Sequence, residues 1–142
     1  MSGSGTLNLA GAGARTIASE GTLALGNGTN GGLGANYKID GGTHTVTINP
    51  KPVTISGTKQ YDGDTVVHSN STEAQINLGV VGESLLWTGN GISASANVGT
   101  QNVATGTWAL ADQVSAASNY TFSGASMTID ITPRPVRLTG TR

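Results

Sequence analysis

The sequence TVTINPKPVTI at residues 45–55 returns as TIDITPRPVRL at residues 128–138, an offset of 83 residues (128 − 45). The correspondence extends without a gap from residues 36–58 to residues 119–141, and 10 of these 23 positions are identical. Duplication at a fixed spacing indicates that each repeat is one structural unit and that the chain belongs to a tandem array. Such arrays set length and present surfaces more often than they catalyse reactions.

Apolar and polar residues alternate through the repeated block. One face is predicted to carry His44, Val46 and Ile48 in the first copy and Met127, Ile129 and Ile131 in the second. The opposite face of the first copy carries only threonines. A period of two residues is typical of half-buried strands in antiparallel sheets. By the same rule, Val53 and Ile55 form the next inward pair, matched by Val136 and Leu138.

The alternation of apolar and polar residues continues along the chain and predicts the fold class. Further strands are expected at residues 66–68, 75–78, 84–88, 92–96 and 105–110, separated by glycine and asparagine turns. Only residues 112–118 could form a single helical turn. We therefore predict an all-β fold, an antiparallel two-layer sandwich of immunoglobulin-like character in tandem repeats. The alternative is a β-grasp-like roll, which would need a helix.

The Pro-x-Pro pairs mark the predicted boundaries. Residues 1–49 are predicted to be the C-terminal half of a preceding repeat, residues 50–132 a complete repeat, and residues 133–142 the first strand of the next. Residues 21–25 match residues 106–110 at an offset of 85 (106 − 21), and at that offset Leu7 falls on Ile92. Prolines favour extended backbone on either side, so we expect a semi-rigid connection between repeats.

The half-repeat at residues 1–49 should lack partners for its apolar side chains. The residues expected to seek a partner are Leu7, Leu9, Leu23, Leu25, Tyr37, Val46 and Ile48. An incomplete repeat exposes both an apolar face and strand edges. We therefore expect local disorder near the N-terminus or association between copies by strand exchange.

Composition narrows the functional classes. Only 11% of residues are charged, the net charge is −1, and there is no cysteine. The chain therefore lacks the basic surface that nucleic acids require, and it cannot form disulfides. No apolar run approaches the roughly 20 residues needed to cross a bilayer, so we expect neither nucleic-acid binding nor membrane insertion. The opening residues MSGSG lack the charged and apolar regions of a signal peptide.

Three short motifs point to a known family. GTKQYDG at residues 57–63, NVGT at residues 97–100 and NY followed by ITPRPV at residues 119–136 together resemble the YDG-type repeat of hemagglutinin-like (filamentous haemagglutinin-type) bacterial adhesins. Asp64 departs from this pattern, in which an uncharged residue is more usual. Within the motif, Asp62 is expected to cap backbone N–H groups and Gly63 to take a positive φ.

The resemblance implies a secreted or cell-surface protein of a Gram-negative bacterium. It implies a non-catalytic role in cell attachment or biofilm cohesion and brings no cofactor. The partners it implies are adjacent repeats of the same chain, other adhesin copies, glycans and matrix polysaccharide.

The residues themselves give little support to catalysis or metal binding. His44 occupies the position of Met127 and is expected to be a strand residue beside the core, while His68 has no nucleophile-elbow context near it. Residues 62–64 (DGD), with Glu73 at the twelfth position, resemble the start of a calcium loop. Valines at positions 66 and 67 break the ligand pattern. We therefore predict no enzyme, no cofactor and no metal.

Aromatic side chains are the remaining candidates for a ligand site. Trp87 and Tyr61 are the residues on which a glycan platform is most plausible, although the default interpretation of Trp87 and Trp108 is core packing. A spacer module should bury Trp87, whereas a binding module should expose Trp87 or Tyr61 beside polar groups. Lys59 and a buried Asn119 are candidates for an intramolecular crosslink.

Overall fold

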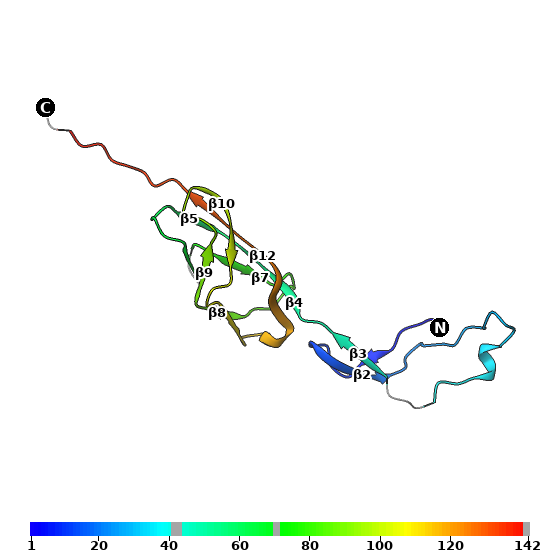
Figure 1. Cartoon of the computed structure of the whole chain (residues 1–142). Coiled ribbons are helices and arrows are strands. Elements are labelled where there is room, and N and C mark those ends of the chain that lie inside the picture. The colour runs from blue at the N-terminus through cyan, green and yellow to red at the C-terminus, as the bar shows by residue number, and fades with distance from the viewer. Residues whose placement is uncertain (41–43, 70–71, 141–142) are drawn as a thin grey trace. The chain divides into compact units, whose positions relative to one another are not determined.

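The computed structural model describes residues 1–40, 44–69 and 72–140, and the chain divides into two compact units, Met1–Pro50 and Lys51–Arg142. We call them unit 1 and unit 2. The regular elements of both units are strands, and the helical residues described are confined to two short 3-10 turns, Gly34–Asn36 (η1) and Ala117–Asn119 (η2) (Figure 1). The all-β prediction is therefore confirmed.

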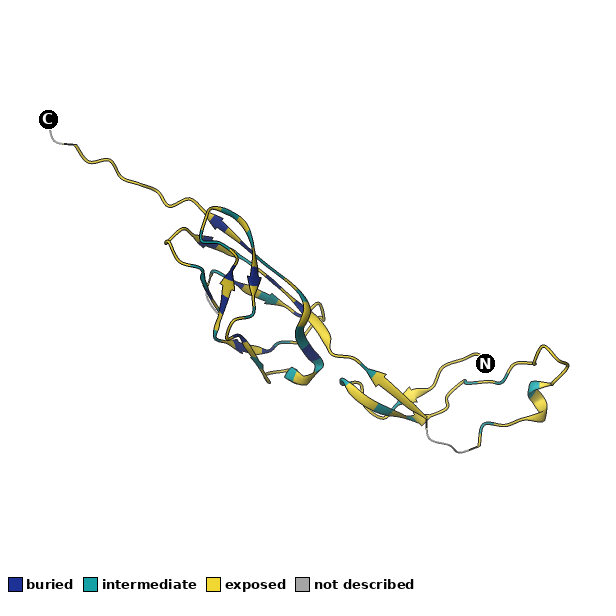
Figure 2. Ribbon diagram, in the orientation of Figure 1, coloured by how far each residue is buried: buried dark blue, intermediate teal, exposed yellow. Residues whose placement is uncertain are grey.

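Unit 1 contains a small antiparallel sheet. Strands β1 (Thr6–Leu7), β2 (Gly13–Ser19) and β3 (Thr45–Ile48) form it in the order β1-β2-β3. None of the described residues of this unit is buried (Figure 2). The inward positions predicted for His44 and Val46 are wrong here, because no second layer covers the described sheet. His44 is exposed, and Val46 is 41% exposed.

Unit 2 contains nine strands in its described residues. They are β4 (Lys51–Ser56), β5 (Thr58–Gln60), β6 (Val66–His68), β7 (Gln75–Asn77), β8 (Leu86–Thr88), β9 (Asn90–Ser93), β10 (Gly99–Ala104), β11 (Ala109–Ala111) and β12 (Tyr120–Thr132). The main sheet has the order β6-β9-β10-β12-β4-β7, with β5 also pairing with β12, and β8 and β11 form a separate two-stranded sheet.

Strand β12 organises unit 2 and departs from the antiparallel expectation. It pairs antiparallel with β10 on one side, but on the other it runs parallel first to β4 and then to β5. Parallel neighbours need a long crossover, and residues 61–119 provide one between β5 and β12. The β4 register is interrupted between Thr121 and Ser126, around Gly124, whose φ of 72° lies in the left-handed region.

All the buried apolar residues among those described lie in unit 2. The predicted inward residues Val53, Ile55, Ile129 and Ile131 are all buried, so the period-two prediction holds for this copy. Trp87 and Trp108 pack beside them with ring centroids 5.0 Å apart at an interplanar angle of 59°. β-branched residues pack well on a pleated sheet, and aromatic residues bury a large apolar area, so together they stabilise this core.

Several predicted boundaries differ from the structure. Strand β10 was not predicted, because its sequence GTQNVA lacks apolar alternation. Residues 105–110 form a turn followed by the start of β11, not one strand. Residues 133–140 form no strand, and Val136 and Leu138 are exposed because no described strand pairs with them.

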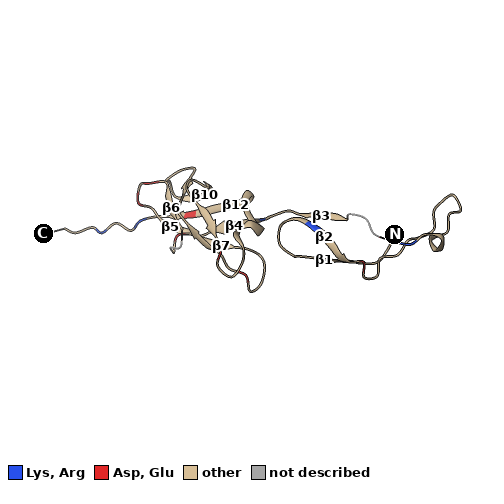
Figure 3. Ribbon diagram, turned by 90° about the horizontal axis from the view of Figure 1, so that it is seen from below, with Lys and Arg blue, Asp and Glu red and all other residues tan. Residues whose placement is uncertain are grey.

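Charged residues are few, and the described helices were compared with the length and hydrophobicity that a membrane span needs. Few ribbon segments carry charged side chains in either unit (Figure 3). In the part of the chain that the structure describes, no helix has the length and hydrophobicity to cross a membrane.

Candidate functional site

The Tyr61-Asp62-Gly63 motif forms the turn that the sequence predicts. Gly63 has a φ of 90°, and the Asp62 carboxylate accepts a hydrogen bond from the Asp64 N–H at 3.1 Å. The Tyr61 N–H donates to the carbonyl of Thr132 at 2.8 Å, which extends the pairing of β5 with β12 by one residue. The motif therefore ends β5 and redirects the chain towards β6.

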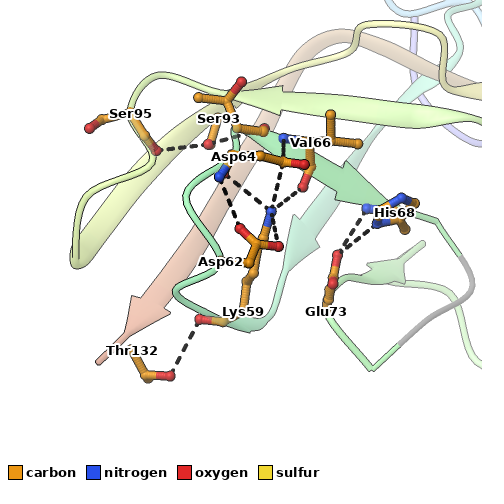
Figure 4. A network of polar contacts seen from close by, with 10 residues as sticks. Lys59, Asp62, Asp64, Val66, His68, Glu73, Ser93, Ser95 and Thr132 are labelled. Carbon is orange, nitrogen blue, oxygen red and sulfur yellow. Dashed lines mark hydrogen bonds and ion pairs between the residues drawn. The ribbon is translucent and has the colours of Figure 1, made fainter. Parts of the chain in front are cut away.

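Lys59, two residues before the motif, is the centre of the polar network in Figure 4. Its side chain is buried, yet its Nζ lies 3.1 Å from carboxylate oxygens of both Asp62 and Asp64. It also donates to the carbonyl of Val66 at 2.6 Å and to that of Asp64 at 3.3 Å. An ammonium group has only three protons to donate, so these oxygen atoms are enough to accept all of its hydrogen bonds.

The network shifts the pKa values of its members. Burial lowers the pKa of Lys59, but the hydrogen bonds and charges of Asp62 and Asp64 outweigh burial and leave this pKa above its ordinary value. The pKa of Asp62 is lowered first by the Asp64 N–H and then by Lys59. The pKa of Asp64 is lowered first by the Val66 N–H and then by Lys59. All three groups are therefore held in their charged forms.

The residues of the calcium-like pattern contact other side chains in the structure. Asp62 and Asp64, the first two acidic residues of that pattern, bind the Lys59 ammonium group. Glu73, at the twelfth position, contacts His68 instead, with its carboxylate 3.2 Å from Nδ1. No group of three metal-ligating side chains occurs among the described residues.

The crosslink considered between Lys59 and Asn119 does not fit the strand register. Lys59 pairs with Ile131 near the end of β12, whereas Asn119 precedes Tyr120, which pairs with Lys51. The two residues thus lie at opposite ends of a 13-residue strand, and strands rise about 3.3 Å per residue. Asn119 is also only half-buried.

The two candidate aromatic residues lie in different environments. Trp87 is 3% exposed and belongs to the core cluster, so its ring presents no platform to solvent. Tyr61 is 40% exposed and borders an open groove of about 650 Å³. The other residues lining this groove are Asn97, Val98 and residues 133–136.

Tyr120, the tyrosine of the repeated block in unit 2, forms a hydrogen bond within the unit. The Tyr120 hydroxyl donates to the carboxylate of Glu83, and burial together with this contact raises the pKa of Tyr120 to about 12. The hydrogen bond in turn lowers the pKa of Glu83. Tyr37, which occupies the matching position in the first copy, is largely exposed.

Unit 1 reproduces the strand pairing of the back half of unit 2. The partners are Gly13↔Ile48 and Thr16↔Thr45 in β2 and β3, and Gly99↔Ile131 and Asn102↔Thr128 in β10 and β12. The register is the same at an offset of 86 residues on one strand (99 − 13) and 83 on the other (131 − 48). The glycines that open β2 and β10 have φ values of 120° and 123°.

Side-chain and turn details are reproduced as well. The Thr22 N–H donates to the Ser4 carbonyl at 2.9 Å, and the Thr107 N–H donates to the Asn90 carbonyl at 2.8 Å. In both turns the threonine Oγ1 accepts a hydrogen bond from the backbone N–H of the same partner residue, at 3.0 Å. The 3-10 turns η1 and η2 lie 83 residues apart (117 − 34).

This correspondence corrects one alignment made from the sequence. Leu7 pairs with Ile17 on β2, and the matching pair in unit 2 is Ser93 with Val103 on β10. Leu7 therefore corresponds to Ser93, not to Ile92. A slip of one residue moves a side chain to the opposite face of a sheet, and Ile92 is indeed exposed whereas Ser93 is buried.

Together, the fold and the motif define an all-β module in which a polar network around Lys59 stabilises a turn. The family model of the YDG domain matches residues 44–129, which is more than half of the chain. The chain therefore belongs to the YDG domain family. Comparison with curated proteins and with solved structures finds no match.

Proposed function

We propose that this chain is a non-catalytic structural repeat module of a large secreted or surface-anchored bacterial adhesin, contributing to cell attachment or biofilm cohesion. The observation that carries the proposal is the repetition of one strand register in both units, with β2–β3 matching β10–β12. Repeats that share a register are suited to building an extended array in which each contacts its neighbours. Membership of the YDG domain family agrees with this role.

The polar contacts of unit 2, which join the buried Lys59 and Tyr120 to exposed carboxylates, support a structural role. Lys59 and its two carboxylates bind one another and adjacent backbone groups, and Tyr120 binds Glu83. These charged groups are committed to holding turns, which leaves them unavailable for acid–base chemistry. A structural module uses its polar network in this way, whereas a catalytic site needs an unsatisfied acid or base facing a substrate.

The connection between repeats is part of the proposal. Strand β3 ends at Ile48 and β4 begins at Lys51, so only Asn49 and Pro50 separate them. A connection this short, containing a proline, restricts bending more than a glycine- and serine-rich linker would. We infer that the tandem array is semi-rigid and serves to hold other adhesive parts away from the cell surface.

The finer architecture is also proposed. An immunoglobulin-like sandwich is built from antiparallel sheets, and most pairs in unit 2 are antiparallel. The parallel pairing of β4 and β12, the first and last strands of unit 2, favours the β-grasp-like roll instead. The lack of an α-helix among the described residues of unit 2 favours the sandwich.

The second candidate function is a module that binds a glycan or a host protein. It is favoured by one observation, the open groove beside Tyr61 that is lined by Val98 and by residues 133–136. Aromatic and proline surfaces next to amide groups are suited to sugars and extended peptides. In this function Tyr61 would be the contact residue and Trp87 a core residue.

Two experiments distinguish the functions. Screening the 142-residue chain against glycans and host matrix proteins should give no saturable binding if the module is structural. Saturable binding that is lost in Tyr61→Ala, but kept in the exposed control Val81→Ala, would replace the structural proposal with the binding one. Small-angle scattering of residues 50–132 repeated three times in series should show an extended particle, and freely jointed beads would contradict the semi-rigid array.

A further inference from the structure

Asparagine followed directly by glycine occurs three times in the chain, at residues 27–28, 30–31 and 90–91. In such a pair the backbone nitrogen of the glycine can attack the side-chain amide carbon of the asparagine, because glycine has no Cβ to obstruct the approach. This reaction is one reason why asparagine is a thermolabile residue. Since glycine follows each of the three asparagines, differences in their reactivity must come from the fold.

The pair at residues 27–28 is held by two hydrogen bonds. The Gly28 N–H donates to the Gly32 carbonyl at 2.7 Å, so the proton that must leave before the nitrogen can attack is already bound. The Asn27 side chain is fixed as well, because its Oδ1 accepts the N–H of Gly34, the first residue of η1, at 2.8 Å. Attack by Gly28 would require both bonds to break.

The contact made by Asn27 has a counterpart in unit 2. There the Asp112 Oδ1 accepts the N–H of Ala117, the first residue of η2, at 2.7 Å. The offsets are 85 residues for the acceptors (112 − 27) and 83 for the donors (117 − 34), so the segment between them is two residues longer in unit 1. Asn27 therefore has a structural role that both units share, whereas Asn30 lies within the longer segment.

The pair at residues 90–91 is held within a sheet. Asn90 and Gly91 belong to β9, where Gly91 pairs with Val67 of β6. The Asn90 N–H donates to Thr107 Oγ1 at 3.0 Å, and the Asn90 carbonyl accepts the Thr107 N–H at 2.8 Å. A Cβ added to Gly91 would lie 2.5 Å from the Trp108 ring. The backbone here has neither the freedom nor the space to rearrange.

The pair at residues 30–31 has none of these constraints. Asn30 and Gly31 are exposed, and neither makes a hydrogen bond or an ion pair with the described part of the chain. Gly31 has a φ of 79°, and a Cβ added to it would meet no atom within 4 Å. The matching loop of unit 2, residues 112–114, is exposed too although the core of that unit is complete. Exposure is therefore a property of this loop in both units.

We propose that Asn30 is a site of spontaneous deamidation, and that the fold protects Asn27 and Asn90 from the same reaction. The Gly31 nitrogen loses its proton and bonds to Asn30 Cγ, while the Cγ–Nδ2 bond breaks and ammonia leaves, which produces a succinimide ring. Water from the solvent then opens the ring at either of its carbonyl groups and gives aspartate or isoaspartate. Each product carries a new carboxylate, so the formal net charge falls from −1 to −2 (−1 − 1).

The loop can accept this change without loss of the fold. Isoaspartate adds one methylene group to the main chain, and residues 26–32 contain no strand or helix. Changes of length in such exposed loops cost little free energy. The modification therefore alters the surface charge of unit 1 and leaves the core of unit 2 intact.

Peptide mapping by mass spectrometry tests the proposal on the 142-residue chain. The chain is incubated in a mildly alkaline buffer and cleaved after lysine and arginine, and fragmentation of the peptide of residues 16–38 separates Asn27 from Asn30. Asn30 should convert at least about tenfold faster than Asn27 or Asn90, because the hydrogen bonds at those two sites must break first. In concentrated urea the three rates should become similar, since the contacts that distinguish them are lost.

Two glycine substitutions provide a matched pair. Gly31→Ala places a methyl group beside the attacking nitrogen and should slow the conversion of Asn30 by about tenfold. Gly32→Ala adds the same group one residue later, also with no atom within 4 Å, and should leave the rate nearly unchanged. Equal rates for the three asparagines in the folded chain would overturn the proposal. So would rates that stay equally different in urea, or equal slowing by the two substitutions.

Discussion

Replacing Ile129 by alanine should destabilise unit 2 by about 3–4 kcal/mol. Ile129 is 1% exposed and lies on β12, opposite Gln101 of β10. The change removes three buried carbon atoms, which contribute about 2.4 kcal/mol at roughly 0.8 kcal/mol each. The cavity left in the core cluster, to which both tryptophans also belong, adds the remainder.

Tryptophan fluorescence is the natural assay. Both tryptophans of the chain lie in unit 2 with ring centroids 5.0 Å apart, so their emission reports the unfolding of that unit alone. For a domain of this size, each kcal/mol lowers the melting temperature by about 4–8 °C. Ile129→Ala should therefore lower it by at least about 12 °C.

Ile92→Ala is the matched control for this measurement. Ile92 lies in β9 of the same unit but is 50% exposed. The same three carbon atoms are removed, half of their surface is already in water, and no enclosed cavity results. A loss of about 1 kcal/mol or less is expected. If the two substitutions cost the same, burial in β12 does not determine the stability of unit 2 and the reasoning fails.

Further predictions concern close packing, pH and the buried lysine. Gly91→Ala should destabilise unit 2 by about 1–3 kcal/mol, since an added Cβ would lie 2.5 Å from the Trp108 ring; urea unfolding measures this. Because the pKa of Tyr120 is about 12 in the fold against an ordinary 10.0, its contribution to stability is present below pH 10 and is lost as the pH rises towards 12. Alkaline unfolding curves should show this loss, and Tyr120→Phe should remove it. The pH dependence contributed by Glu83 has the opposite sign. Because the pKa of Glu83 is lowered in the fold, its contribution to stability is present above the ordinary pKa of 4.5 and is lost as the pH falls below it. Lys59→Met should cost about 2 kcal/mol in urea unfolding, because carbonyl groups that Lys59 binds lose their donor.

Control substitutions of the same type at exposed positions show whether these effects are specific to the named sites. Gly140→Ala has no atom within 4 Å of the added Cβ and should be neutral. Lys51→Met removes an exposed lysine that donates to Gly79 and should cost no more than about 0.5 kcal/mol. A Lys51 effect as large as that of Lys59 would mean that burial of the Lys59 network contributes nothing. Alkaline loss that persists in Tyr120→Phe would assign it to another group.

The period-two pattern correctly predicted which residues of β4 and β12 face the core of unit 2, because the apolar residues at alternate positions of these strands are the buried ones. Val53, Ile55, Ile129 and Ile131 are apolar at every second position, and all are buried. Strand β10 escaped prediction because it contains Val103 as its only large apolar residue and depends on backbone pairing with β9 and β12. Local alternation carries no signal for a strand that is held chiefly by its neighbours.

The polar centre was only partly predictable. The capping role of Asp62 and the positive φ of Gly63 follow from turn chemistry and were predicted. The burial of Lys59 was missed, although a signal was present: Thr58 and Gln60 flank it on the exposed face, so alternation places Lys59 inward. Acidic residues three and five positions later could have indicated how such a charge is tolerated.

The repeated block shows why sequence predicts strands better than it predicts burial. Residues 45–48 and 128–131 have nearly the same alternation, and both are strands in the same register with their antiparallel partners. Ile129 is nevertheless buried, whereas Val46 is exposed. Strands β4 and β5 pair with β12, and Trp87 and Trp108 belong to the same core cluster as Ile129, whereas among the described residues of unit 1 only β2 pairs with β3. Burial therefore depends on strands and side chains that are distant in the sequence, and the alternation within a single strand carries no information about them.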